Sequence, residues 1–283
     1  MKLCFCLITL SLICLASADS SQETGFLEIT GNPENVEDFV FKGKEFKLKG
    51  KRLQITSGNQ ASNSQFPYVA ELAINTITGG YKCTASLIGA SWLLTARHCI
   101  VGMPQITSIL ASFGSADNQA QRTQIYVNSA TWMNAADGIN HPDIALFHLS
   151  QPAPTTATIK PVRLPKLAQE NFAYDNYDFT AIGWGQISLG VFSRYLQYTN
   201  FRTLAPTSCF LGQYYMCSQP PTGTSQLLGG DSGGPGVIVE ADGIETQIGV
   251  NVAYVTAGTS IWQKSTRVSN FLQFIKTQTG ISY

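Results

Sequence analysis

The length of the apolar runs is the strongest constraint on the fold of this chain. From Tyr68 onward, short segments rich in β-branched and aromatic residues are interrupted by Gly, Asn, Ser or Pro about every eight to twelve positions, a pattern typical of strands in a sandwich or barrel. The runs span residues 68–74, 86–95, 123–127, 143–149, 179–184, 236–239 and 246–255. The sequence therefore predicts an all-β fold.

One segment near the C-terminus has the period of a helix instead. Residues 269–277 continue an apolar face that begins one position earlier, and Ser269 is a residue type that favours the N-cap. The face consists of Val268, Phe271, Leu272 and Ile275. We expect a C-terminal helix that begins at Ser269.

The first 18 residues have the pattern of a secretory signal peptide. Lys2 supplies the positive start, residues 3–15 are almost wholly apolar, and Ala16, Ser17 and Ala18 form a small-residue cleavage site. The apolar run is shorter than the roughly 20 residues of a membrane-spanning helix, and no later stretch is long enough either. The sequence predicts a secreted, extracellular protein that is not membrane-bound.

Charge is balanced along the chain as a whole. Charged residues make up 13% of the 283 positions and the formal net charge is zero. A nucleic-acid partner is therefore not expected, because such partners require clustered positive charge. The length suffices for a sizeable core in one or two compact domains.

Seven cysteines are present, and Cys4, Cys6 and Cys14 belong to the signal peptide. Without these three, four cysteines remain, and an even number in an oxidising compartment predicts two disulfides. Four cysteines allow three possible pairings. A zinc site is not expected because no two of them have the C-x2-C spacing. The remaining four are Cys83, Cys99, Cys209 and Cys217.

Residues 19–54 differ in composition from the remainder of the chain. The segment begins acidic and becomes basic from Lys42 to Arg52. Such a segment buries little apolar surface, so we expect a solvated arm.

Ser232 is surrounded by glycines in the stretch Gly-Gly-Asp-Ser-Gly-Gly-Pro, residues 229–235. A nucleophile needs a sharp backbone turn and close approach of the substrate, and glycine permits both. The same composition also describes an ordinary turn. Two further segments help to decide whether this stretch is a nucleophile loop or an ordinary turn.

The first is Leu-Thr-Ala-Arg-His-Cys, which contains His98, and the second is Asp-Ile-Ala-Leu, which begins at Asp143. A lone His beside a Cys is commonly structural. An Asp at the start of an apolar strand costs free energy unless it has a partner.

In the order His, Asp, Ser, these three blocks resemble the active-site signatures of the chymotrypsin-like serine proteases. Residues 55–61 with Phe-Pro-Tyr at 66–68 resemble the mature N-terminus of that family, and Gly-Trp-Gly at 183–185 resembles one of its turns. The resemblance covers residues 55–283. It implies two six-stranded Greek-key β-barrels followed by a C-terminal helix.

The resemblance also implies roles for individual residues. Ser232 would be the nucleophile, His98 the general base, and Asp143 the group that orients it. The N–H groups of Gly230 and Ser232 would form the oxyanion hole. The implied disulfides are Cys83–Cys99 and Cys209–Cys217.

Activation by cleavage follows from the same resemblance. The α-ammonium of Ile55 would pair with Asp231, which makes residues 1–18 a signal peptide, 19–54 an activation peptide and 55–283 the protease domain. The implied partners are protein or peptide substrates, an activating protease and protein inhibitors. No cofactor or metal is implied, and a monomer is expected.

The activation site departs from the family pattern. Gln54 precedes Ile55, where Arg or Lys is usual, and the basic pair ends at Arg52. The cut therefore falls after Gln54, or after Arg52 with trimming of two residues.

The specificity pocket departs as well. The position at its base is Gln226, beside Leu227, and Tyr254 and Gln263 replace smaller residues of its walls. A cationic side chain would lack a buried counter-charge, so cleavage after Arg or Lys is not expected. Apolar and amide side chains both remain open, as does a pocket filled by Tyr254 and Gln263.

Three functions can be weighed against these observations. The first is a secreted serine endopeptidase made as a zymogen, and the second is a non-catalytic homologue that binds a partner. The third, an esterase of another fold, would place Ser before Asp and His, the reverse of this order. His141 and His148 are interpreted as surface or loop residues rather than catalytic ones.

Overall fold

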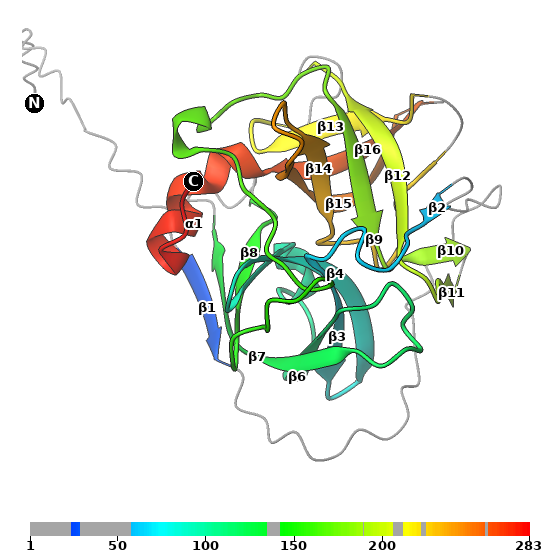
Figure 1. Ribbon diagram of the computed structural model, residues 1–283, viewed down its shortest axis with the longest axis vertical. Helices are drawn as coiled ribbons and strands as arrows, with labels where there is room; N and C mark the ends of the chain where they lie inside the picture. Colours follow the sequence, from blue (N-terminus) through cyan, green and yellow to red (C-terminus); the bar gives the residue numbers. More distant parts are fainter. Residues whose placement is uncertain are drawn as a thin grey trace, which may run out of the picture.

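The computed structural model describes residues 24–28, 58–134, 142–188, 190–205, 212–221, 225–257 and 260–283. Its strands form two closed barrels, one below the other in Figure 1, each made of six antiparallel strands. The expected all-β fold of two six-stranded barrels and a C-terminal helix is confirmed.

The first barrel is formed from consecutive strands in the N-terminal half. Its order is β6-β3-β4-β5-β8-β7, closed by pairing of β7 with β6. The fourth strand returns to lie beside the first, which is the Greek-key arrangement. The strands are β3 (Val69–Thr76), β4 (Gly79–Gly89), β5 (Trp92–Thr95), β6 (Ile106–Phe113), β7 (Thr123–Met133) and β8 (Ala145–Leu149).

The second barrel repeats this order with later strands, β14-β9-β12-β13-β16-β15, closed by pairing of β15 with β14. A short strand, β2 (Asn59–Gln60), adds to β12, and β10 (Gln186–Ser188) pairs with β11 (Val191–Phe192) outside the barrel. The barrel strands are β9 (Asp178–Gly183), β12 (Gln197–Thr203), β13 (Tyr215–Gln219), β14 (Pro235–Val239), β15 (Glu245–Ala257) and β16 (Ser260–Arg267).

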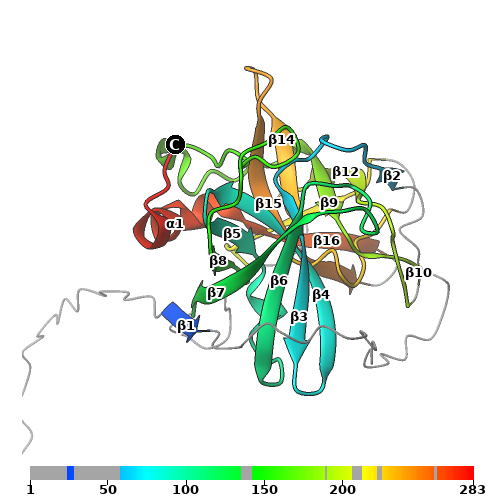
Figure 2. The same ribbon diagram turned by 60° about the horizontal axis from the view of Figure 1, so that its bottom comes forward.

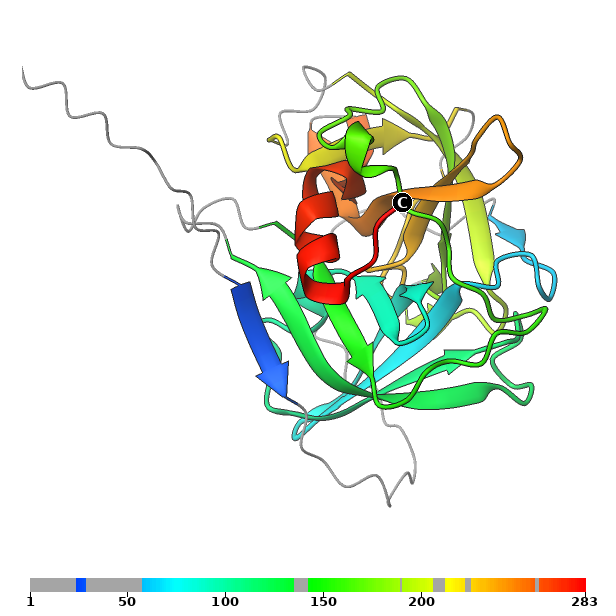
Figure 3. The same ribbon diagram turned by 60° about the vertical axis from the view of Figure 1, so that its left-hand side comes forward.

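Two expected elements differ in the structure. The single apolar run at residues 86–95 is divided into the end of β4, a turn and all of β5. The expected solvated arm contains β1 (Thr24–Glu28), which pairs antiparallel with residues 129–133 of β7 and lies along its edge in Figure 3. The unpaired edge of β7 is a template to which another strand can bind through its backbone. The composition of residues 19–54 therefore does not indicate β1.

The C-terminal helix is present, but its predicted start is wrong. A 3₁₀ turn, η4 (Val268–Phe271), precedes α1 (Leu272–Thr279), and the Ser269 hydroxyl donates to the Phe172 carbonyl at 2.7 Å instead of capping the helix. The predicted apolar face is buried as expected. Gly280 ends the helix with φ 73°, a conformation that favours glycine.

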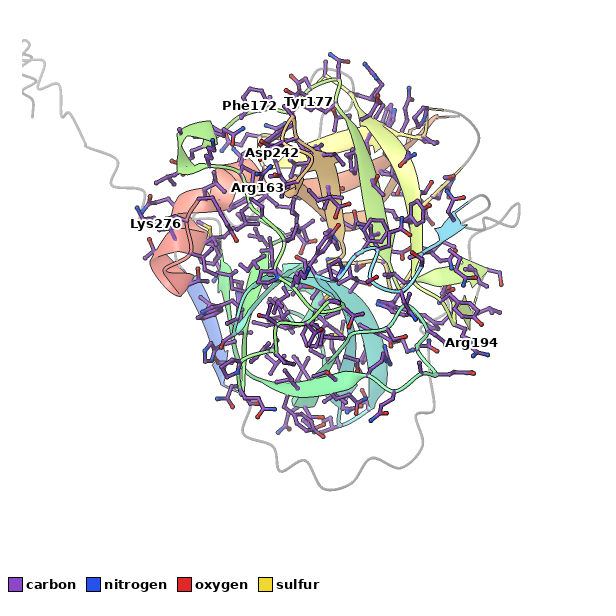
Figure 4. All side chains as sticks on the ribbon, viewed as in Figure 1. Arg163, Phe172, Tyr177, Arg194, Asp242 and Lys276 are labelled. Atoms are coloured by element: carbon purple, nitrogen blue, oxygen red, sulfur yellow. A yellow bond between two sulfur atoms is a disulfide. The ribbon has the colours of Figure 1, made fainter. Side chains whose placement is uncertain are left out.

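The connection between the barrels is fixed by an ion pair. Arg163 lies in this connection and donates to Asp242, in the hairpin between β14 and β15, at 2.6 Å (Figure 4). Figure 2 shows the same hairpin projecting beyond the second barrel. The hydrogen bonds from Arg163 lower the pKa of the Asp242 carboxyl to about 2.

Candidate active site

His98 is held by its backbone neighbours. It lies in the short turn η1 (Arg97–Cys99), which follows β5, and Cys99 forms a disulfide with Cys83 of β4. The expected Cys83–Cys99 bond is therefore present. It anchors the turn that carries the imidazole to the first barrel.

Asp143 pairs with His98 through both carboxylate oxygens. Its Oδ1 accepts from the His98 backbone N–H at 2.9 Å, and Oδ2 lies 2.7 Å from the imidazole Nδ1. Burial raises the pKa of the Asp143 carboxyl, but the hydrogen bonds and charge of His98, together with Lys264, outweigh burial and hold the pKa below its usual value. The carboxylate therefore stays ionised and fixes the orientation of the ring.

The Asp143 backbone is tied to the second barrel. Thr266 of β16 donates its hydroxyl to the Asp143 carbonyl at 2.7 Å. The His98–Asp143 pair is thus positioned where the two barrels meet.

Ser232 lies in the loop before β14 and faces the same junction. Its carbonyl accepts from the Thr84 N–H at 2.8 Å, and Cys99 Sγ lies 3.8 Å from the same oxygen. The Ser232 hydroxyl donates to the Val252 carbonyl at 3.4 Å. Ser232 and His98 both lie in the described ranges, and they are not hydrogen-bonded to each other. Catalytic hydrogen bonds are often long before a substrate binds.

Glycine is required in this loop because of its positive φ angles and because there is no space for a Cβ. Gly233 has φ +83°, and a Cβ there would collide with Thr95 Oγ1 and the Thr84 carbonyl. Gly230 has φ +96°. Neither the Gly230 N–H nor the Ser232 N–H donates to another group in the described part of the chain, which leaves both donors available.

Thr84 connects this loop to both barrels, and sequence reasoning missed it. Its hydroxyl donates to the Gly230 carbonyl at 2.8 Å and accepts from the Trp184 N–H at 3.0 Å. Its N–H donates to Ser232. A Thr in a strand carries no signal of such a role.

Asp231 is a buried carboxylate without a cationic partner among the described residues. It is 1% exposed, and its two oxygens accept from the N–H groups of Gly185 at 2.8 Å and Leu228 at 2.9 Å. Burial raises its pKa to about 7, although both hydrogen bonds act in the opposite direction. Ile55, its expected partner, lies outside the described residues.

The predicted pocket residues are brought together. Gln263 of β16 accepts from the Leu227 N–H at 3.2 Å and pairs with Tyr254 across the β15–β16 ladder. Gln226 is buried next to Leu227. Tyr254, Gln263 and Leu227 are therefore neighbours, and Gln226 is the adjoining residue of the chain.

Other predicted residues have different outcomes. Cys217 is disulfide-bonded, and Cys209, its expected partner, lies outside the described residues, as does His141. His148 lies in strand β8 rather than in a loop, and its ring centroid is 4.7 Å from that of Trp92. In the described ranges no three His, Cys, Asp or Glu side chains are grouped to hold a metal ion.

Comparison with known proteins decides the family. A family model described as Trypsin matches residues 55–275. The chain belongs to the trypsin family of serine endopeptidases. Collagenase from Hypoderma lineatum is 29% identical over 250 residues, which cover 84% of this chain and 91% of that protein. Serine protease 1 from Drosophila melanogaster is 29% identical over 253 residues, covering 83% and 89%.

The solved structures agree with this family. A structure titled HL collagenase matches with a TM-score of 0.67 and 26% identity, covering 80% of this chain and 99% of that one. Mouse Transmembrane protease serine 11C is 26% identical over 81% of this chain, but the chain spans only 54% of its length. Within the part of this trypsin-family chain that the structure describes, no helix has the length and hydropathy to cross a bilayer.

Replacing the Thr84 hydroxyl tests the link between the barrels. Thr84→Val keeps the shape but leaves a buried carbonyl and a buried N–H unpaired, so we expect it to lower the free energy of unfolding by about 2 kcal/mol or more. Thr84→Ser retains the hydroxyl and should cost less. Urea unfolding measures both, and a Val variant as stable as the Ser variant would contradict the assigned bonds.

The raised pKa of Asp231 predicts a pH dependence of precursor stability. The folded state retains a proton up to about pH 7, whereas the unfolded carboxyl loses it near its usual value of about 4, so stability falls as pH rises through this window. Each pKa unit corresponds to about 1.4 kcal/mol. Asp231→Asn should therefore gain stability relative to the parent precursor between about pH 5 and 8.

Both proteins should carry Ser232→Ala to prevent proteolysis during thermal unfolding. Asp242→Asn is the control, because the pKa of Asp242 is about 2 and its titration lies below this range. If the stability of the precursor depends on pH equally with and without the Asp231 carboxyl, the raised pKa of Asp231 is refuted.

Proposed function

We propose that this trypsin-family protein hydrolyses peptide bonds through Ser232, His98 and Asp143, and that it is secreted as an inactive precursor. The observation that carries the proposal is the two-point pairing of Asp143 with His98, at 2.9 and 2.7 Å, beside the loop that presents Ser232. The substrates are proteins or peptides.

In this mechanism Ser232 Oγ attacks the carbonyl carbon of the substrate while His98 Nε2 takes its proton. The oxyanion accepts from the N–H groups of Gly230 and Ser232, each of which is worth about 3 kcal/mol in comparable enzymes. His98 then donates the proton to the leaving amine. Water, deprotonated by the same imidazole, hydrolyses the acyl-enzyme.

Asp143 acts through His98 rather than on the substrate. Its Oδ2 accepts from Nδ1–H, which leaves Nε2 free to receive the serine proton, and the negative charge stabilises the imidazolium. The lowered pKa of Asp143 supports this role, because the carboxylate remains ionised when the ring is charged.

The domain boundaries belong to the same proposal. Residues 1–18 act as the signal peptide, 19–54 as the activation peptide and 55–283 as the protease domain. The match to the family model begins at Ile55, and the buried Asp231 carboxylate is suited to a cationic partner. An activating protease supplies the first cleavage, and protein inhibitors are expected partners of the exposed site.

A covalent probe tests the catalytic proposal. A radiolabelled fluorophosphonate should modify Ser232 of the processed protein, with the labelled peptide identified by mass spectrometry, because only an activated serine attacks the probe quickly. Ser232→Ala is the blank. Processed protein that stays unlabelled would instead favour a non-catalytic homologue.

The N-terminus of active protein tests the activation step. Sequencing should give Ile-Thr-Ser-Gly, since the α-ammonium of Ile55 is needed to compensate the buried Asp231 carboxylate. Active protein should also lose activity when this amine is carbamylated. Full activity of a chain that begins at Leu53 would rule out the Ile55 ammonium.

A further inference from the structure

A series of contacts begins at Ser232 and continues into the second barrel. The Ser232 hydroxyl donates to Val252 in β15, and Tyr254 in the same strand pairs with Gln263 of β16. Gln263 in turn accepts from the N–H of Leu227. These contacts lead from Ser232 through β15 and β16 to Leu227, the residue that follows Gln226.

Gln226 is buried but makes no hydrogen bond within the part of the chain that the structure describes. It is 3% exposed, its Oε1 has no partner, and its carboxamide donates to no group in the described ranges. Unpaired carboxamides in a protein interior are uncommon because each lost hydrogen bond to water costs free energy. Among the described residues, therefore, the carboxamide of Gln226 has donor and acceptor capacity left for a further partner.

Two serine hydroxyls on the neighbouring strands share this condition. Ser218 of β13 is directly opposite Gln263, and Ser265 lies two residues further along β16, so their side chains share one face of the sheet. Both hydroxyls are buried without a hydrogen-bond partner among the described residues. The amide nitrogen of Gln263 also donates to nothing that the structure describes.

These groups are neutral and offer donors and acceptors together. A carboxamide both accepts and donates, a hydroxyl does the same, and both oxygens of Asp231, the nearest acid in this loop, are hydrogen-bonded to the backbone. An ammonium or guanidinium would be desolvated without a counter-charge, and a carboxylate would face Gln226 Oε1. An aliphatic side chain would leave every polar group unpaired.

From this complementarity we infer that Gln226 determines specificity and that the enzyme cleaves after residues with a carboxamide side chain, glutamine or asparagine. The inference rests on the proposed catalytic function and narrows its substrate class. The paired amides form a two-point contact, Oε1 accepting from the substrate NH₂ and Nε2 donating to its carbonyl. This match holds for either orientation of the Gln226 amide.

The chain contains a bond of this type at its own activation site. Gln54 immediately precedes Ile55. Processed enzyme therefore cuts further precursor after Gln54, which makes activation self-propagating once a first molecule is processed.

The test uses processed enzyme and peptides that differ only at the cleaved residue: Gln, Glu, Leu or Lys. We expect kcat/KM for Gln to exceed that for each of the others by about 10²-fold or more, because sites built for hydrogen bonds reject analogues that lack them. Gln226→Leu should abolish this preference. Gln226→Glu should raise cleavage after Lys by supplying a counter-charge, and Gln273→Leu, at an exposed position of helix α1, is the matched control.

A second arm uses the precursor itself. Ser232→Ala precursor incubated with processed enzyme should be cut after Gln54, whereas the same precursor with Gln54→Glu should remain intact. Labelling by fluorophosphonate separates the two hypotheses. Enzyme that labels but prefers Leu or Lys overturns the inference alone, and enzyme that neither labels nor cleaves overturns the proposed function and the inference with it.

Discussion

The contact between Thr84 and the loop of residues 230–232 is the interaction on which the site depends. The proposed catalytic residues come from both barrels, so the mechanism requires the relative position of the barrels to be fixed within hydrogen-bonding distance. One buried threonine does this with its hydroxyl and its backbone, binding Gly230, Ser232 and Trp184. The disulfide at Cys83, one residue earlier, extends the same anchor to the turn of His98.

Two aspartates in this small region have opposite electrostatic surroundings. Asp143 receives the charge and hydrogen bonds of His98, and its pKa is lowered in spite of burial. Asp231 receives only backbone N–H groups, and burial raises its pKa to about 7. The first carboxylate is already in its working state, whereas the second is suited to a cation that cleavage of the chain would create. A His98–Asp143 pair already in place, together with a buried acid that has no cationic partner among the described residues, is what the proposed control by proteolysis requires.

Sequence reasoning predicts those features that are encoded locally. Alternation, turn residues and the short blocks around His98, Asp143 and Ser232 each lie within a few positions, and the fold follows from them. Contacts made by Thr84 and Thr266 depend on which strands become neighbours, and a hydroxyl in a strand has no signature. The N-cap at Ser269 fails for the same reason, because a distant carbonyl at Phe172 is the better acceptor. The pocket residues can be named from sequence, but the absence of partners for Gln226 among the described residues emerges only from the coordinates.

Because β1 pairs with β7, cleavage of the activation peptide and its release from the protease domain become two separate events. In the proposed activation, cutting the backbone after residue 54 leaves residues 24–28 aligned with residues 129–133. The activation peptide is then no longer covalently attached and becomes a peptide ligand bound at the edge of β7. Its release depends on its concentration and affinity rather than on the cleavage itself. No cysteine lies between residues 19 and 54 to hold it there, so dilution after secretion becomes the step that clears this edge.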